Sequence, residues 1–238
     1  MSVIAVAGGT GGVGRAIVDA LNGTGKFGVV VLSPEVLEEN KIGTVISTLE
    51  MMTGHGPEEA LIRAADRSTV TKRYIPSIWG VPYSEETIKD FPAAKLKIDC
   101  LELLKASSLE YTAIYNGLFL DYFVAPVVPT HLVPLALFLT SQTTLLVFRF
   151  VAAHVEKAKW VPEAYILGDK ATPNELLKIA EDAKGAKFTV SHDSLEDLAA
   201  GKVTELPSHL QAYHFVPKPA LQGVLATLGL MVAKGLFN

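Results

Sequence analysis

The chain has a single cysteine, Cys100, and no run of basic residues. One cysteine cannot form an intramolecular disulfide, and this favours a reducing compartment such as the cytoplasm. The 21 lysines and arginines are outnumbered by 25 aspartates and glutamates, and no basic stretch is interleaved with aromatic residues. This composition argues against a nucleic-acid partner, because such binders carry a concentrated basic patch.

Metal-ligand spacing is also missing. The six histidines stand at no metal-site spacing from one another or from carboxylates, so no metal ion is expected. They are His55, His131, His154, His192, His209 and His214. His55 lies in a Gly-His-Gly segment after an expected strand, where contact with a cofactor is one alternative.

A cationic leader and an uninterrupted membrane span are absent as well. The start MSVIAVAGG has no basic residue and its apolar run is broken by glycines, so we expect a strand there and not a signal peptide. The weakly apolar stretch 122–148 carries no charged residue, and its part 132–148 is almost long enough to cross a bilayer. Interruptions favour a buried pocket wall or core over a transmembrane helix. The interrupting residues are Pro126, Pro129, Pro134 and the polar segment 141–144.

Hydrophobic periodicity predicts strands that alternate with helices. Strands are expected at 3–7, 28–32, 44–47, 73–76 and 111–115, and helices at 13–21, 34–41, 57–65 and 91–106. This alternation indicates an α/β protein with a Rossmann-like, doubly wound parallel sheet. At 238 residues the chain suits one such domain, residues 1–120, with a small C-terminal α/β elaboration, residues 121–238. The boundary is soft, between about 120 and 160.

The second half predicts shorter elements. A helix is expected from Thr172, a good N-cap followed by Pro173 and Glu175, to the residues before Gly185. The other expected elements are a strand at 165–167, a strand at 187–190, a short capped helix at 194–200 and an amphipathic helix at 221–233.

Three evenly spaced glycines, Gly8, Gly11 and Gly14, separate the first strand from the first helix. Gly8 permits a tight turn, Gly11 lets the backbone approach a pyrophosphate, and Gly14 lets the helix pack close to the sheet. The helix N-terminus then offers free N–H groups to phosphates. The pattern predicts a dinucleotide loop, with a ligand-free glycine-rich turn as the alternative. The expected cofactor contacts are Gly8, Thr10, Gly11, Gly12, Val13 and Gly14.

Several segments together resemble the NmrA-like and isoflavone-reductase-like family, an atypical branch of the short-chain dehydrogenase relatives, in its fungal form. The likeness touches most of the chain and is far more specific than the glycines alone. The segments are AVAGGTGGVGRAIVDAL, KRYIPSIWGVPYSEE (72–86), KIDCLELLKASSLEYTAIYNGLFLDYF (97–123), KVTELPSHLQAY (202–213) and the final LQGVLATLGLMVAKGLF. The resemblance implies a cytosolic oxidoreductase that uses NADP, with NAD not excluded, and a small-molecule substrate.

The resemblance also implies a helix lysine that transfers a proton or orients the substrate and the nicotinamide ribose. Lys97 is the expected one, as a catalytic and a cofactor-binding residue. Lys95 is the alternative, but two residues on a helix are separated by about 200°, so only one can face the cleft. In a partly dry cleft beside the nicotinamide, burial would lower the pKa of Lys97 and suit it to acid–base work. By its residues alone, this lysine would be read as an ordinary solvated side chain. The Tyr-x-x-x-Lys pair of short-chain dehydrogenases is absent, because Phe91 and Ala93 occupy the positions four before these lysines.

Substrate contacts are expected at the carboxyl edge of the sheet, where open α/β sheets bind ligands. Ser77 follows one strand, and it either bonds substrate or caps a turn. Asn116 and Phe119 follow the next strand in an Asn-Gly-x-Phe turn. Tyr122 and Phe123 either line the pocket or belong to the core. The acidic residue that the family carries after the serine is Ile78 here.

Two stretches normal for such a family are missing. The second strand runs into Ser33 and Pro34 and then directly into the segment that resembles the fourth strand, so about two dozen residues of a βαβ unit are absent. Ser33 and Ser47 are expected at the cofactor site, without the arginine or aspartate that selects NADP or NAD. The shortened crossover would leave the second strand at the edge of the sheet. A second gap is expected within 138–150, before the helix that begins RFVAAHV (149–155).

Three functions therefore compete. The first is an NADPH-dependent reductase of a small organic, secondary metabolite. The second is a non-catalytic, dinucleotide-sensing regulator that binds a partner protein. The third is a degenerate relative whose fold persists without a cofactor. The sequence pattern specifies neither one substrate nor an oligomeric state.

Overall fold

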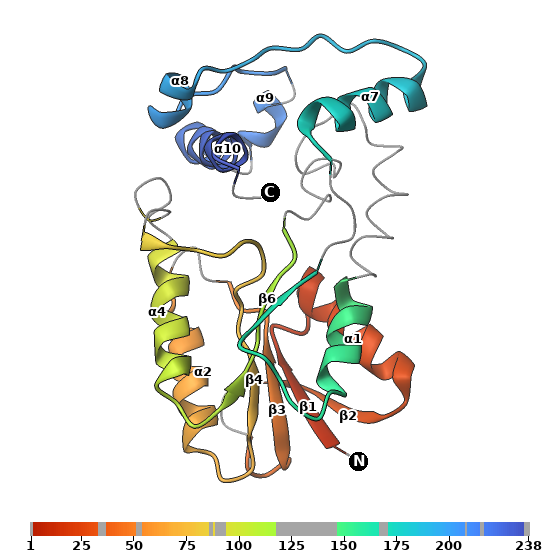
Figure 1. Ribbon diagram of the computed structural model, residues 1–238, viewed down its shortest axis with the longest axis vertical. Helices are drawn as coiled ribbons and strands as arrows, with labels where there is room; N and C mark the ends of the chain where they lie inside the picture. Colours follow the sequence, from red (N-terminus) through yellow and green to blue (C-terminus); the bar gives the residue numbers. More distant parts are fainter. Residues whose placement is uncertain are drawn as a thin grey trace. The chain divides into compact units, whose positions relative to one another are not determined.

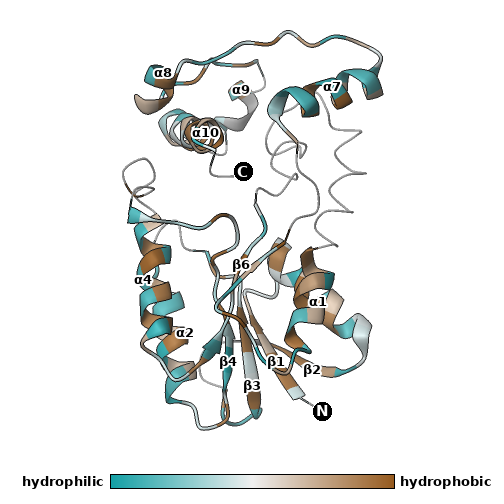
Figure 2. Ribbon diagram, in the orientation of Figure 1, coloured by the Kyte–Doolittle hydropathy of each residue, from teal (hydrophilic) through white to brown (hydrophobic). Residues whose placement is uncertain are grey.

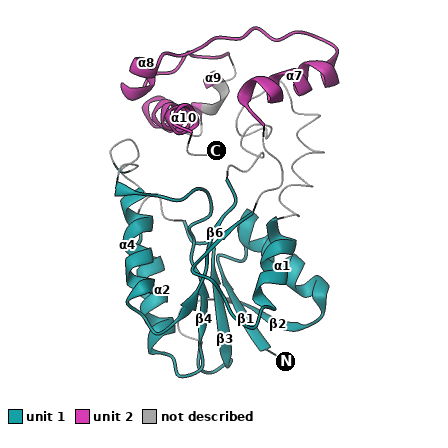
Figure 3. Ribbon diagram, in the orientation of Figure 1, with its two compact units in different colours: residues 1–117, 144–166 teal, residues 118–143, 167–238 magenta. Residues whose placement is uncertain are grey.

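The computed structural model describes residues 2–32, 37–50, 54–85, 88, 94–117, 147–166, 171–207, 209–214 and 217–235. They fall into two compact units, shown in Figure 3. Unit 1 comprises Met1–Gly117 and Thr144–Ile166, and unit 2 comprises Leu118–Thr143 and Leu167–Asn238. Residues 144–166 return to unit 1, so the units are not separated by one cut in the sequence. The functional division into 1–120 and 121–238 stays a prediction.

Unit 1 is built on a five-stranded parallel sheet. Its strands are β1 (Ser2–Ala7), β2 (Phe27–Leu32), β3 (Ile42–Ser47), β4 (Arg73–Ile75) and β5 (Glu110–Tyr111), in the order β2-β1-β3-β4-β5. Every pairing is parallel. The expected Rossmann-like α/β fold is confirmed, and so is the position of the second strand at an edge of the sheet.

A second, two-stranded parallel sheet continues from β5. Strand β6 (Ala113–Tyr115) pairs with β7 (Glu163–Tyr165). Thr112 stands between the two sheets: its N–H donates to the carbonyl of Tyr74, and its hydroxyl donates to the carbonyl of Val161 at 2.6 Å. The single strand expected at 111–115 is therefore shared between two partners.

Helices cover both faces of the main sheet (Figure 1). Helices α2 (Gly56–Arg67) and α4 (Ala94–Lys105) lie on one side, and α1 (Gly12–Thr24) and the helical residues 147–155 lie on the other. Each helix buries residues at helical spacing, such as Ile17 and Leu21 of α1. Helix α1 ends at Gly25, whose φ of 65° is a conformation that glycine adopts without a steric penalty.

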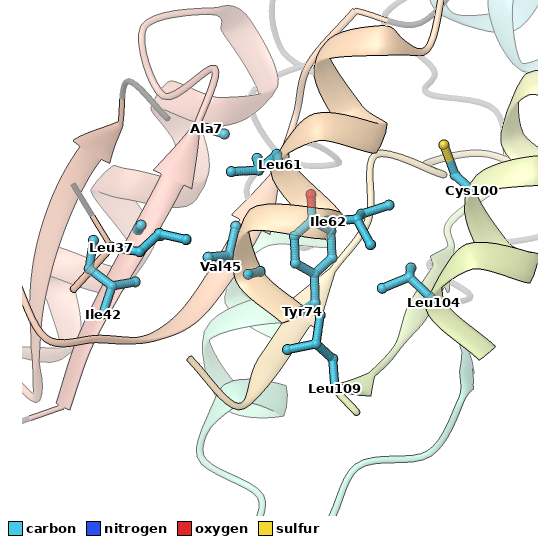
Figure 4. Packing of buried hydrophobic residues seen from close by; sticks show 12 residues of the cluster. Ala7, Leu37, Ile42, Val45, Leu61, Ile62, Tyr74, Cys100, Leu104 and Leu109 are labelled. Atoms are coloured by element: carbon cyan, nitrogen blue, oxygen red, sulfur yellow. The ribbon is translucent and has the colours of Figure 1, made fainter. Parts of the chain in front are cut away.

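Apolar strands form the core because both faces of the sheet are covered. Strands β1 and β3 are predominantly hydrophobic in Figure 2, and the last four residues of each are buried. In Figure 4 the ring of Tyr74 lies among Leu61, Ile62, Leu104 and Leu109. One buried cluster thus joins the sheet to α2 and α4.

The crossover from β2 to β3 is tight, as expected. Residues 33–36 lie outside the described residues, and Leu37–Lys41 form turns, so a helix over 34–41 is wrong for its described part. Lys41 has a φ of 52°, and its N–H donates to the backbone carbonyl of Glu38. The Glu38 carboxylate accepts from the N–H of Thr69, which ties the crossover to the loop before β4. A turn replaces the helix because the chain must reverse directly into β3.

Unit 2 contains α7 (Pro173–Lys184), α8 (Leu195–Ala199), α9 (His209–Ala212) and α10 (Lys218–Ala233). The expected capping box forms between Thr172 and Glu175, and Gly185 ends α7. Leu198 of α8 packs with Ala226 and Leu230 of α10.

The strand expected at 187–190 is wrong. These residues have no regular structure, and the described part of unit 2 offers them no partner strand. Instead, the carboxylate of Glu181 binds the ammonium of Lys187 and the N–H of Phe188, which holds this segment to the end of α7. In the ranges described, no helix is both long and apolar enough to cross a membrane. Most of the apolar stretch 122–148 lies outside those ranges.

Candidate functional site

The glycine loop between β1 and α1 is built from close backbone contacts. Gly8 has a φ of 78°, and its carbonyl accepts a hydrogen bond from Gly11 N–H at 2.9 Å. A β-carbon at Gly8 would lie 2.6 Å from Thr48 Oγ1, and one at Gly14 would collide with the Gly8 carbonyl. Both positions therefore require glycine for the turn and for the approach of the helix to the sheet.

The mouth of α1 is suited to an anion. Gly11 is the N-cap residue, without a side-chain cap, and the first turn of α1 holds no acidic residue. The first N–H groups of a helix lack intrahelical partners, and the helix dipole favours negative charge there. A β-carbon at Gly12 would meet nothing within 4 Å, so there is open space beside this residue of the first turn. The residues present fit a diphosphate, and Thr10 and Val13 lie in the same loop and first turn.

Thr48 fastens this loop to the next strand. Its N–H and its hydroxyl both donate to the carbonyl of Ala7, at 2.9 and 2.8 Å. The carboxyl ends of β1 and β3 are thereby held together directly beneath Gly8. Thr48 was not foreseen from the sequence, because a threonine after a strand has no distinctive spacing.

Lys97 and Lys95 of α4 have opposite surroundings. Lys95 is exposed and pairs with Asp99 at 2.7 Å. Lys97 is partly buried: its Nζ donates to the carbonyl of Trp79 at 3.2 Å and lies 5.0 Å from the centre of the Tyr83 ring. Burial lowers the pKa of Lys97 to about 8, against an opposing contribution from Glu58. An ammonium with this pKa exchanges its proton near neutral pH.

Ser47 and Ser77 lie at the ends of β3 and β4, and a buried glutamate joins them. Glu58 Oε2 accepts from the Ser47 hydroxyl, and Oε1 accepts from Ser77 N–H at 3.1 Å and from the Tyr74 hydroxyl at 3.2 Å. The Ser77 hydroxyl donates to the carbonyl of Leu49 at 2.8 Å. Desolvation raises the pKa of Glu58 despite these hydrogen bonds.

Glu58 was also missed by the sequence reading. A Pro-Glu-Glu start is a common way to begin a helix, and nothing in it marks the first glutamate as buried. Only the packing of α2 onto the sheet distinguishes it from its neighbour Glu59, which pairs with Arg63.

Asn116 follows β6 and ties two loops together. Its Oδ1 accepts from Gly80 N–H at 3.1 Å, and Gly117 N–H donates to the Gly80 carbonyl at 2.9 Å. Gly80 belongs to the segment that carries Ser77 and Trp79, so Asn116 stands beside the candidate site in unit 1. Ile78 of this segment is fully buried.

The remaining expected positions divide into two groups. His55 is the N-cap residue of α2 and lies 3.4 Å from Glu59, in an ordinary helix-surface pairing. The others lie outside the described residues. They are Ser33, Phe119, Tyr122 and Phe123.

Besides its contact with Lys97, Tyr83 lies at the wall of a surface hollow. It helps to line a hollow of about 270 Å³ beside α4, together with Tyr111, Tyr115 and Pro162. The rim carries Glu102, Lys105 and Glu163. Aromatic walls with a few charged groups are usual for small-molecule sites.

The fold is that of known small-molecule reductases. AtPrR2, solved with NADP+ and (+)pinoresinol, has a TM-score of 0.71 at 15% identity, covering 100% of this chain and 89% of that one. Leucoanthocyanidin reductase from Vitis vinifera, in a ternary complex, has a TM-score of 0.71 at 16% identity, covering 99% and 88%. Triphenylmethane reductase from Citrobacter sp., complexed with NADP(H), has a TM-score of 0.69 at 17% identity, covering 98% and 90%. This likeness shows that the chain has the Rossmann-like fold of these proteins.

Relatives that are similar in sequence identify the family of this chain. Oxidoreductase BOA1 of Botryotinia fuckeliana is 34% identical in an alignment of 230 positions, gaps included, and the alignment covers 78% of this chain and 77% of BOA1. Oxidoreductase swnN of Metarhizium robertsii is 26% identical, over 90% of this chain and 82% of swnN. No protein-family model matches the chain. The chain belongs to the family of fungal oxidoreductases that includes BOA1.

The alignment with swnN also bears on the missing stretches. It runs over 282 positions, more than the 238 residues of this chain. This chain therefore has gaps relative to swnN.

Proposed function

We propose that this chain is an NADPH-dependent oxidoreductase that acts on a small organic metabolite. The observation that carries the proposal is the bare-backbone cradle of Gly8, Gly11 and Gly14 at the open mouth of α1. Such a cradle suits the pyrophosphate of a dinucleotide, because glycines lack side chains and the backbone N–H groups of a helix N-terminus can donate to phosphate oxygens. Membership in an oxidoreductase family supports the same function.

NADP is the proposed cofactor. Several structural neighbours were solved with NADP+, NADPH or NADP(H), and this supports the phosphorylated dinucleotide here. Ser33 stands where the family carries its cofactor-selecting residue and lies outside the described residues, so both dinucleotides belong in the test. We retain the cytoplasm as the proposed location, on the strength of the single, buried Cys100.

Lys97 is the proposed catalytic residue. The bound cofactor would supply a hydride to a carbon of the substrate. Lys97 would give a proton from Nζ to the substrate oxygen and regain it from water. Its partly dry position and its pKa near 8 suit that exchange. Lys95, paired with Asp99 on the surface, lacks both features.

The proposed substrate is a small, aromatic or polyketide-like secondary metabolite. One support is the Tyr83 ring, which lies beside Lys97 and also lines the hollow that contains Tyr111 and Tyr115. Another is AtPrR2, a protein with this fold that was solved with (+)pinoresinol. Ser77, Asn116 and Phe119 remain proposed substrate contacts. For Ser77, the hydroxyl is already donated to Leu49 and would act towards substrate as an acceptor.

Fluorescence titration tests the proposal. The purified chain is titrated with NADPH and with NADH, and we expect saturable binding with preference for NADPH. No binding of either at millimolar concentration would overturn the proposal. Lys97→Met is then expected to abolish NADPH consumption with aromatic carbonyl compounds while it preserves cofactor affinity. Lys95→Met is the matched control and is expected to retain turnover.

The non-catalytic regulator is the second candidate. It is favoured by the absent tyrosine and by Ile78, which places a buried apolar side chain where the family carries an acid. A regulator that only senses the cofactor would bind NADP+ and NADPH with comparable affinity and would retain a partner protein in a pull-down. Consumption of NADPH with any metabolite counts against this candidate.

A further inference from the structure

Glu58 is an unusual residue at its position in α2. The other buried members of this helix are Leu61, Ile62 and Ala65, so apolar side chains satisfy the packing of α2 against the sheet. Glu58 is 1% exposed and lies at the N-terminal end of that buried face. Burying a carboxyl costs free energy unless its oxygens are hydrogen-bonded. A residue that packing alone does not require, and that is costly to bury, calls for another explanation.

Three elements of the candidate site supply the hydrogen bonds of Glu58. Ser47 comes from the end of β3, Tyr74 from β4 and Ser77 N–H from the segment after β4. A single carboxyl therefore holds two strand ends in one arrangement. Both strand ends face the edge at which the glycine loop also lies, because Ser47 is followed by Thr48 and Thr48 binds Ala7.

A short chain of contacts leads from Glu58 to Lys97. Ser47 donates its hydroxyl to Glu58, while its carbonyl accepts from Trp79 Nε1 at 3.0 Å. The carbonyl of Trp79 in turn accepts from Lys97 Nζ at 3.2 Å. Ser77, also held by Glu58, lies two residues before Trp79 in the same segment.

We infer that Glu58 is a positioning residue of the proposed site: its carboxyl holds Ser47 and Ser77 and, through Trp79, the carbonyl that binds Lys97. The inference rests on the proposed function of Lys97. It assigns Glu58 an effect on both halves of the site. On one side lies the strand end that supports the glycine loop, and on the other lies the lysine.

Charge adds a second effect on Lys97. The groups that face Glu58 are Tyr74 from β4 and Lys97 and Cys100 from α4. The nearby carboxylate raises the pKa of Lys97, which burial lowers. Removing this charge without changing the shape should therefore lower the pKa of Lys97 further.

Two variants separate position from charge in the full chain. In Glu58→Gln, the amide oxygen can still accept from Ser77 and Tyr74, and the amide N–H can donate to Ser47, so only the charge is lost. Glu58→Leu loses the hydrogen bonds as well. Glu59→Gln is the matched control, because its carboxylate pairs with Arg63 on the helix surface.

The readouts are NADPH affinity by fluorescence and the pH dependence of Lys97 acetylation by acetic anhydride, followed by mass spectrometry of the peptide. Glu58→Gln is expected to keep the NADPH dissociation constant within about twofold and to lower the acetylation pKa of Lys97 by about 0.5 or more. In Glu58→Leu, with circular dichroism showing a folded chain, Lys97 loses its fixed partner. It is then acetylated several-fold faster at high pH, and NADPH binds about 5- to 10-fold more weakly. Glu59→Gln is expected to match the wild type in both readouts.

Unchanged Lys97 acetylation and NADPH affinity in both Glu58 variants would overturn the inference. If Glu58→Leu does not fold, Ser47→Ala decides the question, because it removes one link of the same chain. Faster acetylation of Lys97 in Ser47→Ala supports the inference, and wild-type acetylation overturns it. A wild-type chain that binds neither dinucleotide overturns the proposed function itself, together with this inference. Normal binding with indifferent Glu58 variants overturns the inference alone.

Discussion

A β-carbon on residue 14 would collide with the carbonyl oxygen of Gly8, so Gly8 and Gly14 make a backbone-to-backbone contact that only glycine permits. The same β-carbon would lie 2.6 Å from Thr48 Oγ1, on the neighbouring strand end. The contact brings the first turn of α1 close to the end of the first strand. The geometry of the proposed phosphate site thus depends on the lack of a β-carbon at residue 14.

Gly14→Ala is expected to weaken NADPH binding at least tenfold and to destabilise unit 1 by about 1–3 kcal/mol, because the backbone must shift to admit the methyl group. Gly23→Ala is the matched control: it lies in the same helix, and its β-carbon would meet nothing within 4 Å. It should leave affinity unchanged and raise stability by about 0.5–1 kcal/mol. Fluorescence titration and urea unfolding measure both. Equal affinities of the two variants would contradict the proposed role of the glycine loop.

Lys97→Met is expected to stabilise the chain at pH 7. Burial lowers the pKa of Lys97 to about 8, whereas the unfolded chain keeps the proton to about pH 10.4. Between these values the unfolded state binds more protons, so wild-type stability should rise with pH across this window. The variant lacks this dependence. The free energy of unfolding of Lys97→Met should exceed that of the wild type by on the order of 1–3 kcal/mol at pH 7. The difference should vanish above about pH 10.

Urea unfolding at pH 7 and pH 10 measures this difference, with Lys95→Met as the control. Lys95 is exposed, and its pKa is raised by its bond to Asp99, so its removal should give no gain at pH 7. If the free energies of unfolding of the wild type and of Lys97→Met change equally between pH 7 and pH 10, this prediction is wrong.

His154 should make unit 1 sensitive to acid. It is buried between Phe150 and Trp160, and its Nε2 lies 2.9 Å from the hydroxyl of Thr112. That hydroxyl already donates to Val161, so Nε2 carries the hydrogen and the neutral ring is the stable form.

Burial first, and then Lys157 and Arg73, lower the pKa of His154. The unfolded chain takes up a proton below about pH 6.5 while the folded chain resists it, so stability falls as the pH drops through this value. His154→Phe should lose the Thr112 hydrogen bond but should lack this acid-dependent part, on the order of 1 kcal/mol between pH 7 and pH 5. Thermal unfolding across this range tests it, with the exposed His192→Ala as control. An unchanged acid slope in His154→Phe would rule the mechanism out.

The capping box of α7 offers a test in unit 2. Thr172 Oγ1 accepts from Glu175 N–H at 3.2 Å, and the Glu175 carboxylate accepts from Thr172 N–H at 2.7 Å. Thr172→Ala should cost about 1 kcal/mol of helix stability, and Thr172→Ser should restore most of it. Hydrogen exchange of the first turn of α7 measures both. Protection in Thr172→Ala equal to that of the wild type would show that the cap contributes nothing.

Most strands and helices could be predicted because their information is local. The expected capping box at Thr172, the stop at Gly185 and the short helix capped by Ser194 all form. The strand expected at 187–190 fails because a strand needs a partner, and periodicity in one segment cannot supply it. The two-turn helix expected over 34–41 fails in its described part because the direction of the chain, and not propensity, governs the connection into β3.

The sequence by itself determined the Rossmann-like class, the three-glycine turn and the edge position of β2, since each depends on residue type and spacing along a short stretch. Only the tertiary structure decided that Glu58 would lie buried among Ser47, Tyr74 and Ser77, and that Lys97, not Lys95, would face inward towards Trp79. The physical reason is that burial and hydrogen-bond partners are properties of packed elements. A carboxylate or an ammonium has the same letter in the sequence whether water or another strand surrounds it.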